Sequence, residues 1–146
     1  MRASPPEHLL SHKTSERTYY DRARREAAPF EDALLVLPGG EILETTIANL
    51  FLVREGRLVT PESALPLLAG IARAASSARR APWAWKWRRG DRSSKRVASI
   101  EGAFLTNALF PVEPVAEIEG FGPLGGLSGL VRDLWGEVAA RASGPV

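Results

Sequence analysis

The sequence predicts a mixed α+β fold, and three observations predict it. A helical pattern follows a capping residue near the N-terminus, short apolar runs rich in β-formers fill the middle, and a second helical pattern ends the chain. The 146 residues suit one domain over residues 1–146, and a domain of this length buries about 68–70% of its unfolded surface. The hydrophobic fraction of 45% is ordinary for a globular protein with a sizeable core.

The first helix is predicted after an extended lead-in over residues 1–12, where Pro5–Pro6 disfavours helix. Thr14 or Ser15 can accept the first unpaired backbone N–H groups and so begin the helix. The helix ends before Pro29, which cannot continue it.

Four short strands are predicted next. An apolar strand at 33–37 leads through a Pro-Gly-Gly turn into a second strand at 41–44. Leu50–Val53 and Leu58–Val59 then flank Glu55–Gly56, which is a favourable pair for a tight turn, so a β-hairpin is expected.

The segment after this hairpin predicts an anion site. Thr60–Pro61 is expected to end the sheet, and a loop containing Pro66 leads to Gly70–Ile71–Ala72–Arg73, which reads as the opening of a helix. The first turn of a helix presents unpaired N–H groups and the positive end of a dipole, which together favour a phosphate.

The last third of the chain predicts an apolar strand, a loop and a helix. The strand lies within 101–106 and is followed by prolines at 111 and 114, and 120–129 reads as a glycine-rich loop. The terminal helix has an apolar stripe, expected to be core, made by Leu130, Val131, Leu134, Trp135, Val138 and Ala139.

Composition narrows the classes of protein. With no cysteine the chain has no disulfide or thiolate metal site, and its two histidines cannot form a zinc site alone. No apolar run approaches the roughly 20 residues of a membrane span. Met1–Leu10 lacks the apolar region of a secretory signal, so a cytoplasmic enzyme or enzyme fragment is expected.

Residues 74–97 are atypical, being basic and rich in tryptophan. Arg73 to Arg96 holds nine basic residues and one acid, so the net charge of +2 leaves −6 for the rest of the chain. Trp83, Trp85 and Trp87 alternate as in a strand. Basic residues among aromatics also suit a nucleic-acid groove, but an otherwise acidic chain argues against nucleic acid as a partner. A third hypothesis is an out-of-frame translation between two compensating shifts in the gene.

The order and spacing of residues 44–73 resemble the signature of the fold-type IV (class IV) pyridoxal-phosphate enzymes, which include branched-chain and D-amino-acid aminotransferases and aminodeoxychorismate lyase. In that family a glutamate precedes Asn–aliphatic–aromatic, a hairpin ending in threonine, and an aliphatic–x–Gly–aliphatic–x–basic turn. The matching positions are Glu44, Thr46, Asn49, Leu50, Phe51, Leu58, Thr60, Leu68, Gly70, Ile71 and Arg73.

A second stretch, residues 101–115, is similar to aminodeoxychorismate lyases in its apolar strand, its Asn–Ala–Leu and its two proline-containing steps. The resemblance implies that Asn107 and the backbone of Ala108 lie beside the cofactor phosphate and the substrate carboxylate. The alternative is an edge strand punctuated by prolines, which is compatible with that role. Residues 74–97 do not follow the family pattern.

The resemblance assigns the covalent link to the cofactor to Lys13, because family members carry this lysine ahead of a helix and lyases carry a Lys–Thr pair there. By position alone Lys13 would be a solvated surface charge. Glu44 is implied to pair with the pyridine nitrogen and keep it protonated, which makes the ring an electron sink. Without the resemblance, Glu44 would be a strand-edge carboxylate in solvent.

The resemblance also implies contacts with the cofactor ring and with its phosphate. Thr45 and Thr46 are implied to lie near the cofactor ring, although β-formers in a strand explain them equally well. The amides of Ile71 and Ala72 are implied to bind the phosphate. Asn49 is expected to be a buried hydrogen-bonding residue that fixes the hairpin.

As a whole, the resemblance implies the larger, C-terminal domain of the D-amino-acid aminotransferase-like fold, a mixed sheet or pseudo-barrel with flanking helices and with the N-terminal domain absent. The implied cofactor is pyridoxal 5'-phosphate. The implied activity is that of a 4-amino-4-deoxychorismate lyase, which eliminates pyruvate to give 4-aminobenzoate for folate biosynthesis. A branched-chain or D-amino-acid aminotransferase is the alternative, and a truncated non-catalytic remnant or binding module is the alternative of another class.

The expected partners are a small amino substrate and either a second copy in a homodimer or a chain that supplies the missing domain. In the family an arginine of the N-terminal domain binds the phosphate, and no residue before Lys13 matches it. The isolated chain is therefore expected to bind the cofactor weakly, because charge-assisted bonds to phosphate are the stronger ones.

Overall fold

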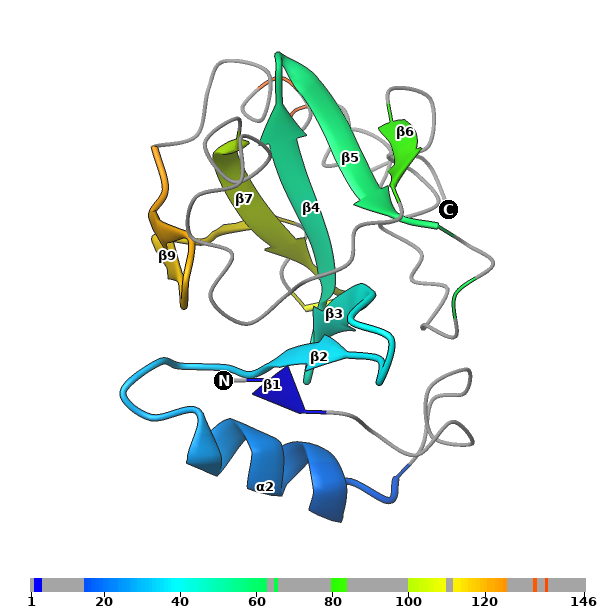
Figure 1. Cartoon of the computed structure of the whole chain (residues 1–146), viewed down its shortest axis with the longest axis vertical. Helices are drawn as coiled ribbons and strands as arrows, with labels where there is room; N and C mark the ends of the chain where they lie inside the picture. The colour runs from blue at the N-terminus through cyan, green and yellow to red at the C-terminus, as the bar shows by residue number, and fades with distance from the viewer. Residues whose placement is uncertain are drawn as a thin grey trace.

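The computed structural model of the chain describes residues 2–3, 15–62, 65, 80–83, 100–109, 112–125, 133 and 136. Its elements in chain order are β1 (Arg2–Ala3), α2 (Thr18–Glu26), β2 (Leu34–Val36), β3 (Ile42–Thr45), β4 (Asn49–Arg54), β5 (Arg57–Pro61), β6 (Arg80–Trp83), β7 (Ile100–Thr106), β8 (Glu113–Pro114), β9 (Glu117–Ile118) and β10 (Gly122–Pro123). They confirm a mixed α+β fold (Figure 1).

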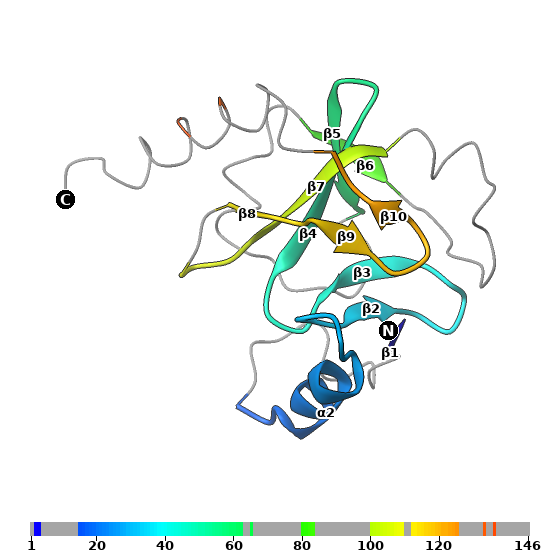
Figure 2. The same cartoon turned by 90° about the vertical axis from the view of Figure 1, so that its left-hand side faces the viewer.

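The strands form three sheets. One has the order β1-β2-β3, one has β6-β5-β4-β7-β8, and β10 pairs with β9. β6 runs parallel to β5, whereas β4 is antiparallel to both β5 and β7. The three-stranded sheet lies between α2 and the five-stranded sheet, as two perpendicular views show (Figures 1 and 2).

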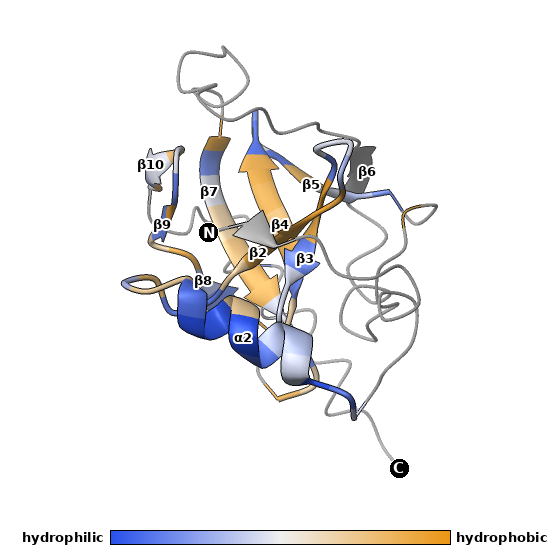
Figure 3. Ribbon diagram, turned by 60° about the horizontal axis from the view of Figure 1, so that its bottom comes forward, coloured by the Kyte–Doolittle hydropathy of each residue, from blue (hydrophilic) through white to orange (hydrophobic). Residues whose placement is uncertain are grey.

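The helix α2 packs on the three-stranded sheet through one narrow face. Tyr20 is buried against Leu35 and Leu43, and further along Ala23 and Ala27 pack with Ala33. Small alanines let the helix lie close to the strands. The rest of α2 is hydrophilic, in contrast to the hydrophobic β4 (Figure 3).

The centre of the five-stranded sheet is β4, which is buried along most of its length. On one face, the rings of Phe51 and Phe104 stack with centroids 5.0 Å apart and interplanar angle 2°, and Val53 and Leu58 pack beside them. On the other face, Leu50 and other buried residues form a separate cluster, completed by Val36, Ile42, Leu52 and Ala103.

The hairpin between β4 and β5 confirms the predicted turn. Glu55 and Gly56 both have positive φ, 51° and 67°. Two consecutive positive values define the type I′ turn that suits the twist of paired strands. Gly56 tolerates this conformation because it has no Cβ, and its N–H donates to Glu101 Oε1 over 3.1 Å.

The strands at 33–37 and 41–44 are confirmed within a residue or two, but three details were predicted wrongly. α2 begins at Thr18, with Arg17 at the N-cap position and no side-chain cap, rather than after Thr14 or Ser15. Thr60–Pro61 belongs to β5 instead of ending the sheet. Proline is tolerated there because it is the last residue of the strand, where a missing N–H costs little.

The third detail concerns the glycine-rich stretch. Within the predicted loop 120–129, Gly122–Pro123 forms β10 and pairs with β9, because Gly120 and Gly122, with φ of 84° and 82°, allow the chain to reverse. Of the predicted terminal helix, Asp133 and Gly136 are described, and both are helical. No helix in the described ranges is long and apolar enough to cross a membrane.

Candidate active site

Glu44 is a buried carboxylate held by a neighbouring amide. Its residue is only 8% exposed, so the alternative of a strand-edge carboxylate in solvent is wrong. Asn49, the first residue of β4, donates a hydrogen bond from Nδ2 to Glu44 Oε2 over 2.8 Å. This bond fixes the direction of the carboxylate across the connection between β3 and β4. Asn49 is therefore a buried hydrogen-bonding residue, as expected, and its side chain holds Glu44.

Tyr20 belongs to the surroundings of Glu44, and sequence reasoning did not select it. Burial raises the pKa of Tyr20, the charge of Glu44 raises it further, and the Arg17 guanidinium, 5.6 Å from the ring centroid, lowers it. Tyr20 therefore stays neutral in the physiological pH range. Its position on the buried side of α2, one helical turn before Ala23, was the available signal.

Thr46 is fixed by two side chains from outside the predicted site. Its hydroxyl donates to Asp32 Oδ1, and its carbonyl accepts a hydrogen bond from Arg17 Nη2 over 3.2 Å. While this hydroxyl donates to Asp32 it cannot also donate to a cofactor, although it can still accept a hydrogen bond. Asp32 and Arg17 were not predicted, since the sequence alone does not show that α2 and the segment after it lie against the β3–β4 connection.

Asn107 ties a second loop to the first. Its Nδ2 donates to the carbonyl of Ile47 over 3.2 Å, and its Oδ1 accepts the N–H of Leu109 over 2.7 Å. The loop that follows β7 therefore lies against the loop between β3 and β4. Ala108 is exposed within this turn. Two segments that are 60 residues apart in the chain thus meet at one end of the five-stranded sheet.

Four of the predicted site residues lie in the part of the chain that the structure describes. Glu44 is in β3 and Thr46 follows it, whereas Asn107 and Ala108 follow β7, and the Asn107 side chain bonds the loop between β3 and β4. Lys13, Ile71 and Ala72 lie outside the described residues, as do 74–79 and 84–97 of the basic segment. In the described ranges, no group of three or more metal-ligating side chains converges to hold a metal ion.

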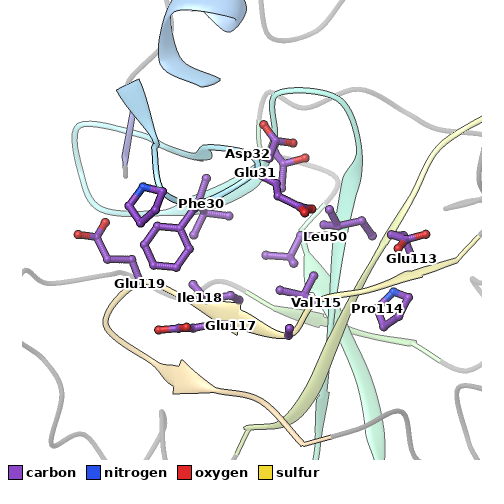
Figure 4. Close-up of a pocket in the computed structure, with 15 residues that line it drawn as sticks. Phe30, Glu31, Asp32, Leu50, Glu113, Pro114, Val115, Glu117, Ile118 and Glu119 are labelled. Atoms are coloured by element: carbon purple, nitrogen blue, oxygen red, sulfur yellow. The ribbon is translucent and has the colours of Figure 1, made fainter. Parts of the chain in front are cut away.

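A cavity of about 350 Å³ lies elsewhere, between the segment after α2 and strands β8 and β9 (Figure 4). Among the described residues that line it, Leu50 and Leu105 are apolar and Thr45 comes from the end of β3. The charged residues of this described lining are all acidic: Glu31, Asp32, Glu113, Glu117 and Glu119. Carboxylates repel a phosphate dianion, so these residues do not favour the phosphate of the implied cofactor.

Comparison with known proteins identifies the class of this chain. The family model of amino-transferase class IV matches residues 1–118. The chain therefore belongs to the class IV aminotransferase family, whose members are pyridoxal-phosphate enzymes. This confirms the family resemblance seen in residues 44–73.

The similar proteins include both aminotransferases and a lyase. A branched-chain-amino-acid aminotransferase candidate of Thermotoga maritima is 39% identical over 61 residues, which cover 42% of this chain and 22% of that protein. A candidate 4-amino-4-deoxychorismate lyase of Legionella pneumophila superposes with a TM-score of 0.82 at 22% identity, covering 96% of this chain and 53% of that one.

A third structure is a hypothetical aminotransferase of Mycobacterium tuberculosis in its PLP-bound form. It has a TM-score of 0.72 and 19% identity, covering 89% of this chain and 46% of that chain. These structural matches confirm the fold. The chain spans about half the length of the solved structures that it matches.

Proposed function

We propose that this chain carries the cofactor-binding part of a pyridoxal-phosphate enzyme that acts as a 4-amino-4-deoxychorismate lyase. The observation that carries the proposal is the buried Glu44 carboxylate, fixed by Asn49 beside the loop of Asn107. A buried anion oriented in advance suits the protonated nitrogen of a pyridine ring, and burial strengthens such a pair because little water screens it. The residues present therefore fit pyridoxal phosphate.

When bound, pyridoxal phosphate supplies an electron sink for bonds at the substrate α-carbon. The chain's own residues have separate tasks. Glu44 holds the ring nitrogen in its protonated form, and Asn49 keeps the Glu44 carboxylate in place. Lys13 bonds the cofactor covalently and moves protons at the α-carbon, for which its amine must be available as the free base. The amides of Ile71 and Ala72, with Asn107 and the backbone of Ala108, bind the phosphate and the substrate carboxylate.

The lyase is preferred to a transaminase because of the Asn107–Ala108–Leu109 segment, which is similar to the lyases, and because a candidate lyase is among the solved structures with a similar fold. An amino-acid aminotransferase is the second candidate, favoured by the 39% identity to the Thermotoga maritima relative. Both need the same cofactor and the same lysine. A homodimer and a cytoplasmic location belong to the proposal as properties of the family.

The first test is chemical mapping. The purified chain is mixed with pyridoxal phosphate, reduced with borohydride and analysed by mass spectrometry. We expect one pyridoxyl adduct, on Lys13, and we expect Lys13→Ala to lose it while its circular dichroism is unchanged. An adduct spread over Lys86 and Lys95 would contradict the assignment, since it would show unselective reaction with lysines rather than a site at Lys13.

The second test concerns Glu44 and the substrate. The isolated chain should show little turnover unless a partner chain restores the missing domain. With that partner and 4-amino-4-deoxychorismate, release of pyruvate and 4-aminobenzoate is expected, whereas transfer of an amino group to 2-oxoglutarate would favour the second candidate. Glu44→Gln should keep cofactor absorbance but lose most turnover, because a neutral amide no longer favours the protonated ring. Glu117→Gln, an exposed carboxylate on β9, is the matched control and should behave as the wild type.

A further inference from the structure

Thr106, at the end of β7, has a buried hydroxyl for which the described part of the chain offers no hydrogen-bond partner. The residue is 1% exposed. The other buried threonines differ. Thr60 donates to the carbonyl of Leu50 over 3.0 Å, Thr45 bonds the backbone of Ala48, and Thr46 donates to Asp32. Thr106 is thus an exception among otherwise satisfied threonines.

This hydroxyl lies in the layer that holds the candidate active site. Thr106 stands directly opposite Asn49 in the pairing of β7 with β4. Directly opposite residues of antiparallel strands point to the same face, with Cβ atoms about 4.5–5.5 Å apart. Asn49 in turn holds Glu44, and the residue after Thr106 is Asn107. Thr106 therefore faces the same layer as the Glu44–Asn49 pair.

A threonine in this position costs stability unless something bonds it. An unsatisfied buried hydroxyl keeps its desolvation penalty, whereas valine has the same shape, favours strands and carries no polar atom. Packing alone therefore explains a β-branched side chain at position 106 but leaves its oxygen without a role. A polar group that enters this layer would remove the penalty.

We propose that Thr106 is a further cofactor-binding residue, whose hydroxyl hydrogen-bonds a polar group of pyridoxal phosphate bound beside Glu44 and Asn49. The inference rests on the proposed function. Glu44 and Asn49 are themselves only 8% and 6% exposed. A ring nitrogen that reaches Glu44 must therefore enter the buried layer in which Thr106 lies. The contact with Glu44 and the contact with Thr106 thus require the cofactor to reach the same buried space.

The test uses three variants of the full chain. Thr106→Val removes the hydroxyl and keeps the shape, Thr106→Ser keeps a hydroxyl, and Thr60→Val removes a hydroxyl that is already bonded. Two quantities are measured without substrate: the dissociation constant for pyridoxal phosphate from cofactor absorbance, and the urea midpoint of the cofactor-free chain. Neither measurement depends on turnover.

We expect Thr106→Val to raise the urea midpoint of the cofactor-free chain and to weaken cofactor binding by about tenfold to a hundredfold, the effect of one hydrogen bond to a charged group. Thr106→Ser should bind within about threefold of the wild type. Thr60→Val should lower the urea midpoint, because it removes the hydroxyl that donates to the Leu50 carbonyl, and should leave cofactor binding nearly unchanged.

Two results would overturn the inference. If the wild type binds pyridoxal phosphate and Thr106→Val binds it equally well, the hydroxyl does not touch the cofactor, although the proposed function stands. If Thr106→Val lowers the urea midpoint and leaves binding unchanged, the hydroxyl is a structural group bonded by internal water. A wild-type chain that binds no cofactor even at millimolar concentration would instead contradict the proposed function, and the inference with it.

Discussion

The two faces of β4 differ in chemistry although their residues alternate along the same six-residue strand. One face begins with Asn49, which holds the buried Glu44, and continues through the stacked rings of Phe51 and Phe104. The other face begins with Leu50, which lines the acidic-rimmed cavity beside β8 and β9. Because successive side chains of a strand point to opposite faces, one strand can supply a polar site on one side and an apolar wall on the other.

The difference between the two faces explains why this cavity is a poor guide to the cofactor site. Among the described residues, the cavity lining gathers apolar side chains and carboxylates, which do not suit the phosphate of the implied cofactor. The Glu44 face is closed more tightly, with three polar residues, Glu44, Asn49 and Thr106, each less than 9% exposed. Polar groups buried to this degree carry a desolvation cost and so point to function more strongly than an open hollow does.

The largest expected effect comes from removing the ring that supports the polar face. Phe104→Ala should lower the free energy of unfolding by about 3–5 kcal/mol, since Phe104 is fully buried and stacked on Phe51. Urea unfolding followed by circular dichroism measures the change. Leu109→Ala is the control: Leu109 is 91% exposed, so its loss should change stability by less than about 0.5 kcal/mol. A cost below about 1 kcal/mol for Phe104→Ala would show that the stacked layer is not core.

A smaller effect is expected from Asn49→Ala, which removes the amide that holds Glu44. Loss of a hydrogen bond to a buried charged group should cost about 1.5–3 kcal/mol. In the Glu44→Gln background the same change should cost less, because the neutral partner makes a weaker bond. A double-mutant cycle by urea unfolding measures this difference. Purely additive costs would mean that Asn49 and Glu44 do not interact in solution.

The smallest expected effect is the contribution of Tyr20 to the loss of stability at alkaline pH. Burial and the charge of Glu44 raise its pKa above 10.0 in the folded chain, so the folded state holds the phenol proton more tightly than the unfolded state. The resulting stability is fully present below the unfolded pKa and is lost as pH rises through the folded pKa. Tyr20→Phe should therefore give a flatter decline in unfolding free energy above pH 10. An unchanged decline in Tyr20→Phe would assign it to other groups, such as Tyr19, whose pKa is also raised by burial.

The sequence by itself determined the features that depend on residues close together along the chain. Glu55–Gly56 forms its turn because local backbone preferences suffice for a type I′ geometry. The apolar runs of β4 and β7 pair with each other in the interior of the five-stranded sheet, where most of their side chains are buried. The spacing from Glu44 to Arg73 was also enough to indicate the class IV family, which the match over residues 1–118 confirms.

Only the tertiary structure decided which polar groups meet. Thr46 bonds Asp32, Asn107 bonds Ile47, and Thr106 stands opposite Asn49, across 14, 60 and 57 residues of sequence respectively. No local pattern encodes such pairs, because they follow from the register of strands and from where α2 packs. The same reason explains the start of α2 at Thr18 rather than near Thr14: contacts with the β3–β4 connection, through Arg17 and the Thr46 carbonyl, outweigh a local capping preference of about 1 kcal/mol.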